Sequence, residues 1–215
     1  MRIDENGNRT NEFVEIWVGL DDLEQVVGVP IRADPWRFAR VTEFLDFRVI
    51  DHLLHRWHGE HTVSVNLHCG TVMQLRFDEQ LMRINPAWRS SMIFELALSE
   101  MLDDPVPFMA AVHKLHAAGF RIALDAVIWP SVVQISGSLD KFEMAKVPWT
   151  DAFAKVTAEQ KASVRKVIDS SPKVNFVLNR CTRPENVEVG RTLGFEIFQG
   201  WGVVPVQQAP VHREY

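Results

Sequence analysis

The sequence lacks the features that define several protein classes. Its two cysteines, Cys69 and Cys181, are too few and too far apart for a disulfide framework or a CxxC zinc site. No apolar run approaches the roughly 20 residues that span a bilayer, and Met1 to Thr10 is polar, unlike a secretion signal. We therefore expect reduced thiols, a cytoplasmic location and no membrane segment.

The sequence also lacks a large net charge of either sign. The formal net charge of -5 gives no electrostatic reason to expect direct nucleic-acid binding, which needs clustered Lys and Arg on one face. What is present is enough apolar sequence for one core, with 47% hydrophobic residues and no Pro- or Gly-rich linker. We expect a polar segment over residues 1–12, one domain over 13–207 and a tail over 208–215.

Strand-like and helix-like patterns alternate along this domain. The first two apolar runs, Phe13–Leu20 and Val26–Ile31, are typical of an opening hairpin. Helical spacing follows from Val41 to Trp57, and it returns between Phe108 and Leu115. The further strands are expected at Val63–Leu67, Ile93–Leu96, Arg121–Leu124, Lys141–Val147, Val174–Leu178 and Phe195–Gln199. Repeated βα units in this number predict an α/β fold with a closed, TIM-like (β/α) barrel.

Polar residues end these apolar strands. In a barrel the carboxyl ends of the strands and the following loops carry the chemistry, so these residues are the candidate site. They are Asn66, Glu95, Asp125, Lys146, Asn179 and Gln199.

Five short segments resemble, in order and spacing, the motifs of the EAL domains of cyclic di-GMP phosphodiesterases. VSVNLH (Val63 to His68) is similar to the VNLS strand and FELAL (Phe94 to Leu98) to the ExTE strand. GFRIALDA (Gly119 to Ala126) resembles the strand that ends in two aspartates, and MAKVP (Met144 to Pro148) the KID strand. LGFEIFQGW (Leu193 to Trp201) resembles the family's final strand. The resemblance implies a barrel, with one strand reversed in many members, that binds two divalent cations and a cyclic dinucleotide.

Several motif positions differ from the family pattern. The resemblance places Pro30 at the signature glutamate, Ala126 at the second aspartate and Pro148 at the KID aspartate. It also places Asn179 and Thr182 at the two glutamates of the EGVE motif. The phosphate-binding arginine that follows the signature glutamate has no clear equivalent, and Asp34 lies near its place. The chain is therefore expected to be a degenerate EAL domain.

These differences remove metal ligands. Two-metal phosphodiester cleavage needs cations about 3.5–4 Å apart, and hard cations such as magnesium need oxygen ligands with compensating charge. The vestigial pocket retains Asn66, Glu95, Asp125, Lys146 and Gln199. Lys146 belongs either to a surviving metal site or to a salt bridge with Asp125 or Glu95, and the salt bridge is favoured. Neither catalysis nor Mg or Mn binding is expected.

Three tryptophans follow the strand ends. Trp129, Trp149 and Trp201 are expected to converge on the face where the ligand would bind. Exposed aromatic residues of this kind form protein interfaces, but the same rings also serve to plug a barrel mouth. The sequence leaves both interpretations open.

Three functions remain in competition. The first is a catalytically inactive regulatory protein that acts through a protein partner, such as a transcription regulator, or as a homodimer. The second is a non-catalytic cyclic di-GMP receptor, although loss of the phosphate-binding arginine makes that binding doubtful. The third is a weak residual phosphodiesterase, which the missing ligands disfavour.

Overall fold

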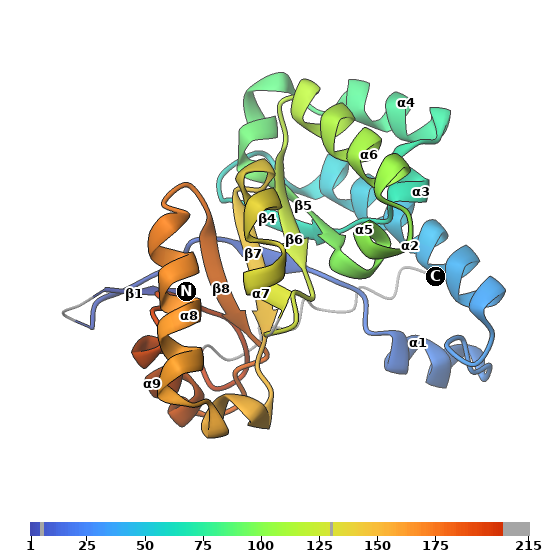
Figure 1. Ribbon diagram of the computed structural model, residues 1–215. Coiled ribbons are helices and arrows are strands. Elements are labelled where there is room, and N and C mark those ends of the chain that lie inside the picture. Colours follow the sequence, from blue (N-terminus) through green and yellow to red (C-terminus); the bar gives the residue numbers. More distant parts are fainter. Residues whose placement is uncertain (5–6, 130, 204–215) are drawn as a thin grey trace.

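A curled, largely parallel sheet covered by helices forms the body of the protein. The computed structural model describes residues 1–4, 7–129 and 131–203 (Figure 1). Its sheet has nine strands in the order β2-β1-β9-β8-β7-β6-β5-β4-β3. The strands are β1 (Arg2–Ile3), β2 (Arg9–Thr10), β3 (Val14–Ile16), β4 (Val63–Asn66), β5 (Met92–Ala97), β6 (Arg121–Asp125), β7 (Met144–Pro148), β8 (Asn175–Asn179) and β9 (Ile197–Phe198). The run from β3 to β9 is parallel throughout.

Helices connect the parallel strands, as βα units require. They are α1 (Leu20–Val27), α2 (Pro35–Arg56), α3 (Cys69–Val72), α4 (Leu75–Arg83), α5 (Leu98–Asp103), α6 (Pro105–Ala117), α7 (Ser131–Gln134), α8 (Ala158–Ser170) and α9 (Pro184–Thr192). Asp34 and Asp104 cap the N-termini of α2 and α6, each of which has a proline as its first residue. The carboxylate of Asp34 accepts from the backbone N–H of Trp36 and Arg37, and that of Asp104 accepts from the backbone N–H of Val106. Short 3₁₀ helices lie at Pro86–Ser91, Ser136–Lys141 and Asp151–Lys155.

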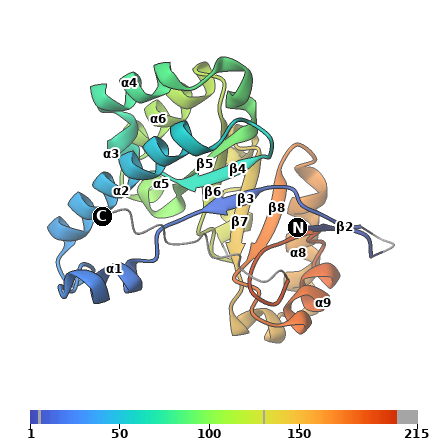
Figure 2. The same ribbon diagram turned by 180° about the vertical axis from the view of Figure 1, so that it is seen from behind.

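The expected closed barrel is not formed by the described residues. The sheet remains open, with β2 at one edge and β3 at the other (Figure 2). The reversed strand is β1, which pairs antiparallel with β9 through Arg2 and Ile197. Residues 1–12, expected as a polar segment, thus contribute β1 and β2 to the sheet. The expected tail over 208–215 lies outside the described residues.

The predicted opening hairpin is wrong. Only Val14–Ile16 is a strand, and the next segment folds as α1. Asp21 and Asp22 lie in the first turn of this helix, where carboxylates interact favourably with the helix dipole. Gly28 ends it with a left-handed φ of 70°. Because the backbone groups of Leu20–Val27 are hydrogen-bonded within the helix, this segment cannot form a ladder with β3.

Apolar side chains fill two layers around the sheet. The larger core joins the outer face of the sheet to the covering helices and includes Phe47, Phe94, Phe108 and Leu178. Among the described residues, no helix combines the length and apolar character needed to cross a membrane. The concave face of the sheet carries the second, smaller layer, from which the candidate site is built.

Candidate functional site

Two layers of side chains stack on the concave face of the sheet. The lower layer is apolar, and it consists of Ile93, Ala123, Met144, Val177 and Ile197, with Phe13 packed against them. Side chains two residues apart point to the same face of a strand. A polar side chain lies two residues after each of these six positions and so on the same face of the sheet. These side chains are Glu95, Asp125, Lys146, Asn179, Gln199 and Glu15. The stacking of the two layers places a polar cluster at the carboxyl end of the sheet.

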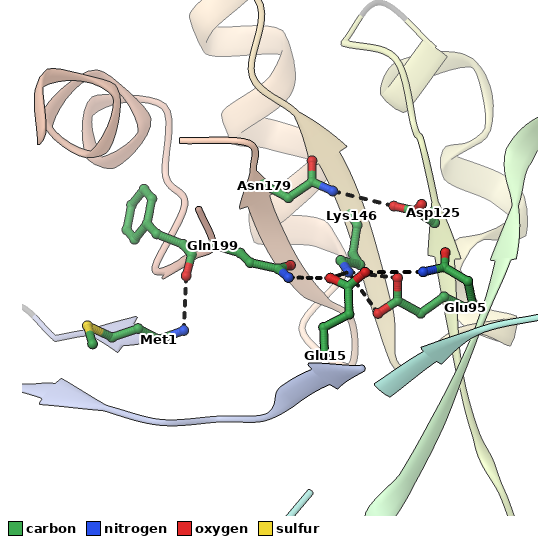
Figure 3. Close-up of polar contacts among 9 residues, drawn as sticks. Met1, Glu15, Glu95, Asp125, Lys146, Asn179 and Gln199 are labelled. Atoms are coloured by element: carbon green, nitrogen blue, oxygen red, sulfur yellow. Dashed lines mark hydrogen bonds and ion pairs between the residues drawn. The ribbon is translucent and has the colours of Figure 1, made fainter. Parts of the chain in front are cut away.

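The structure brings together the five residues predicted for the vestigial pocket, together with Glu15, which the sequence analysis missed. Glu15 lies on β3 and binds three of the predicted residues (Figure 3). Its carboxylate accepts hydrogen bonds from Asn66 at 3.1 Å, from Lys146 at 2.9 Å and from Gln199. The signal was a single charged residue inside an apolar strand run, two positions after Phe13.

Lys146 is the centre of the cluster. Its ammonium group donates to both oxygens of Glu95 at 2.7 Å as well as to Glu15. The side chains of Lys146 and Glu95 are 1% and 0% exposed, so water cannot screen the pair. The salt-bridge interpretation of Lys146 agrees with this geometry.

The cluster holds more negative than positive charge. Burial, only partly opposed by Lys146, raises the pKa of Glu95 to about 7, and the carboxylates of Glu15 and Asp125 add to the rise. Burial also disfavours the charge of Lys146, but Glu95, Glu15 and Asp125 outweigh it and raise the pKa of Lys146. Burial opposes the charge of Glu15 too, yet Lys146, Gln199 and Asn66 together lower its pKa. The buried carboxyl that takes up a proton most readily is therefore Glu95.

The pKa of Glu95 predicts a pH dependence of stability. Because the folded protein holds this proton more tightly than the unfolded chain, the free energy of unfolding should fall as the pH rises from about 4.5 to about 7. Urea denaturation at pH steps across this window should show that Glu95→Gln, which mimics the protonated form, is less dependent on pH than the parent. A parent and a variant with the same pH profile would contradict the assignment.

Other groups contribute elsewhere in this profile. The lowered pKa of Glu15 matters only at lower pH, because its stabilisation is lost as the pH falls through the folded value. A hydrogen bond to Asp46 raises the pKa of His68 despite burial, so its contribution is lost as the pH rises above about 6.5. Comparing the parent with Glu95→Gln cancels the contribution of His68, and the contribution of Glu15, which shares Lys146 with Glu95, lies at lower pH.

A cavity of about 840 Å³ opens above the polar cluster. Asn66, Asp125, Lys146, Asn179 and Gln199 contribute to its wall, as do the aromatic residues Phe13, Trp17, Phe38 and Trp201. Asn179 donates a long hydrogen bond of 3.5 Å to Asp125. The buried side-chain oxygens of Asn179 and Gln199 have no hydrogen-bond partner among the described residues. The size and the spare polar groups are typical of a small-molecule site.

One wall of this cavity is held by a buried hydrogen-bond network. Asp46, which is 6% exposed, accepts from the backbone N–H and ring Nδ1 of His68 and from the hydroxyl of Thr71. These bonds fix the loop that follows β4 against α2. His68 is thereby held at the cavity wall with one ring nitrogen engaged.

The positions predicted as lost are distributed around the site. Asn179 lines the cavity, whereas Ala126, Pro148 and Thr182 follow or end β6, β7 and β8 without lining it. Pro30 lies in the loop between α1 and α2, where its carbonyl accepts from Arg37 at 2.9 Å. Pro30 therefore lies apart from the polar cluster at the carboxyl ends of the strands.

The donor set does not fit a two-cation centre. Both oxygens of Glu95 bind Lys146, and Glu15 is shared among Lys146, Asn66 and Gln199. Ala126 and Pro148 offer no side-chain oxygen. Asp125 is therefore the one described carboxylate of the cluster that is not bound to Lys146, and it cannot supply the ligands of a second cation by itself. Within the described ranges, no group of three or more His, Cys, Asp or Glu is arranged to hold a metal.

The three tryptophans do not form one exposed face. Trp129 is 7% exposed and packs against Phe153, with ring centroids 4.6 Å apart. Trp149 stacks on the same Phe153 at 5.2 Å. Trp201, by contrast, is 63% exposed at the cavity mouth. The first two rings therefore belong to the core beside the site, and only Trp201 is available to a ligand or partner.

Comparison with known proteins identifies the architecture. No family model matches the sequence, and no curated protein matches it. Among solved structures, the chain is similar to the EAL domain of Xanthomonas citri FimX in complex with cyclic di-GMP, with a TM-score of 0.63 and 12% identity over 84% of this chain and 77% of that chain. The chain is also similar to Vibrio cholerae LapD, an S helix-GGDEF-EAL protein bound to cyclic di-GMP. That match has a TM-score of 0.61 and 14% identity, and it covers 79% of this chain and 44% of that chain.

A third similar structure has a different source. Bacillus subtilis YkuI, a protein with an EAL domain in complex with cyclic di-GMP and calcium, gives a TM-score of 0.56 and 11% identity over 82% of this chain and 45% of that chain. This chain thus spans less than half the length of the LapD and YkuI chains. Identities this low bear on the fold alone. The chain has an EAL-like α/β fold, built here as an open, curled sheet.

Proposed function

We propose that the protein is a non-hydrolysing EAL-like regulatory protein whose cavity binds a cyclic dinucleotide, with cyclic di-GMP as the first ligand to test. The observation that carries the proposal is the position of Lys146. Its ammonium group is bound to Glu95 and Glu15 at the base of an open cavity of about 840 Å³. The pocket is retained, while two of the carboxylates that catalysis would use are bound to Lys146.

The absence of hydrolysis follows from the donor set. Cleavage of a phosphodiester at neutral pH needs an activated water and stabilisation of the charge on the leaving oxygen. Glu15 holds the strand position beside Asn66 that we assign to the signature glutamate, which leaves three carboxylates in the cluster. All three act on Lys146, and no oxygen ligand comes from Ala126 or Pro148. The weak residual phosphodiesterase is therefore the least favoured of the candidate functions.

Ligand binding is supported by the shape and lining of the cavity. Small-molecule sites are concave, with apolar walls and a few polar groups that orient the ligand. Phe13 and Trp201 supply ring faces for a nucleobase, and the spare oxygens of Asn179 and Gln199 accept hydrogen bonds. FimX, LapD and YkuI, which share the fold, have been solved with cyclic di-GMP.

Calorimetry with and without magnesium tests the proposal. We expect micromolar binding of cyclic di-GMP that is unchanged by magnesium or by a chelator. The variant Asp125→Asn tests whether a cation takes part in binding. If the Asp125 carboxylate only repels the phosphates of the ligand, the variant should bind the nucleotide equally or more tightly. If a cation bridges the carboxylate and the phosphates, the variant should bind more weakly. Absence of binding heat from the wild-type chain, or a strict need for magnesium, would contradict the proposal.

A second candidate function is action through a protein partner alone. It is favoured by α1, which has no buried residue and whose Val26 is 85% exposed. Trp17 and Trp36 on either side of α1 are 55% and 71% exposed. An apolar surface of this kind is typical of protein contacts, with a transcription regulator or a second copy of the chain as the expected partner. A partner captured from cell extract equally well with and without cyclic di-GMP would favour this candidate.

A further inference from the structure

Arg180 is a cation of the cavity wall that lacks a partner. It directly follows β8 and lines the cavity beside Asn179 and Trp201. No ion pair or hydrogen bond joins its side chain to another residue in the described part of the chain. Two other basic side chains of the wall are by contrast already bound, Lys146 to two carboxylates and His68 to Asp46. Arg180 therefore presents an exposed, unneutralised guanidinium at the mouth of the pocket.

The backbone of Arg180 is strained. Its φ of 58° is in the left-handed region, which a residue with a Cβ adopts at a cost and glycine adopts freely. The EGVE motif to which this segment was compared has glycine at the same place. An arginine in place of glycine at such a position points to a role for its side chain.

Hydrogen bonds on both sides hold this conformation. The carbonyl of Asn179 accepts from the backbone N–H of Trp149 at 2.8 Å. The N–H of Cys181 donates to the carbonyl of Gln199 at 2.9 Å, and Cys181 is fully buried. The peptide groups flanking Arg180 are thus fixed by loops after β7 and β9. This fixed turn places the residue reproducibly at the cavity.

We propose that Arg180 is the anion-binding residue of the cavity and pairs with a phosphodiester group of the ligand. This inference rests on the proposed function. A guanidinium is planar, remains charged and matches two phosphate oxygens with two parallel N–H donors. It also supplies positive charge that the cluster of Glu15, Glu95, Asp125 and Lys146 lacks. Arg180 is therefore placed to offset part of the negative charge of a phosphodiester ligand.

The variant Arg180→Gly separates this role from a structural one. Glycine relieves the backbone strain, so the variant should melt at the same or a higher temperature than the parent. At the same time its affinity for cyclic di-GMP should fall by about 10- to 100-fold, the loss expected for a charged hydrogen bond. Arg180→Lys keeps the charge but not the planar guanidinium, so its affinity for cyclic di-GMP should lie between those of the parent and Arg180→Gly. Lys166→Gln, a remote exposed change on α8, is the control.

Inorganic phosphate provides an independent probe. It should raise the melting temperature of the parent and of Lys166→Gln, but not that of Arg180→Gly. A parent that ignores cyclic di-GMP yet responds to phosphate through Arg180 would keep this inference and reject the proposed function. Nucleotide or phosphate effects that are equal in the parent and in Arg180→Gly would overturn the inference, as would a parent that responds to neither.

Discussion

Replacing Lys146 by methionine should lower the free energy of unfolding by about 3–5 kcal/mol, the cost of leaving a buried charge without its partner. Lys146 is 1% exposed and binds Glu95 and Glu15 at once. Methionine is similar in length and leaves both carboxylates facing a thioether. Equilibrium urea denaturation at pH 7.5 measures the effect, because the two acids are then most costly to leave unpaired.

Two further variants separate the charge from the packing. Lys166→Met, on the exposed face of α8, should change stability by less than about 0.5 kcal/mol. The double variant Lys146→Met with Glu95→Gln should recover much of the loss, since the most buried acid then carries no charge. A Lys146→Met protein as stable as the parent would show that the ion pair does not form, and the account of the site would have to be abandoned.

Replacing Trp129 by alanine should also destabilise the fold strongly, by about 3–5 kcal/mol, as large-to-small changes in a core do. Trp129 is 7% exposed, and its ring packs on Phe153, on which Trp149 also stacks. The neighbouring rings cannot collapse into the space without losing their own contacts. The melting temperature and the denaturant midpoint should both fall.

Trp201 is the matched control for Trp129. It is 63% exposed, so Trp201→Ala should alter stability by less than about 0.5 kcal/mol. If Trp201 stacks on a nucleobase, this variant should instead weaken nucleotide binding. Equal stability losses in the two variants would contradict the division into one core ring and one surface ring.

Several strand positions could be predicted from the sequence because alternation and strand length are local properties. Val63–Asn66 and Arg121–Asp125 lie within one residue of the expected strands. Barrel closure could not be predicted in the same way, because it depends on a ladder between β2 and β3, which are distant in the sheet. The helix α1 could not be predicted either, because the apolar residues before and after Gly28 are compatible with both a hairpin and a helix.

The polar cluster was predictable where a polar residue ended an apolar run, as at Asn66 and Asp125. Glu15 escaped because apolar residues continue beyond it to Trp17 and Val18, so it did not mark the end of a strand. For the tryptophans, the sequence predicts the position of the residue but not the orientation of its side chain. Their position after the strands was evident, but whether each ring turns toward Phe153 or toward solvent is decided by tertiary packing.

Whether the protein binds cyclic di-GMP without cleaving it can be measured with stoichiometric protein. The protein is incubated with the nucleotide and with magnesium or manganese, the bound fraction is measured by equilibrium dialysis, and the nucleotide is then recovered and separated by chromatography. The account predicts that the nucleotide is retained by the protein and recovered with its ring intact. A linear dinucleotide formed by the wild-type chain, and not by Glu95→Gln, would contradict it.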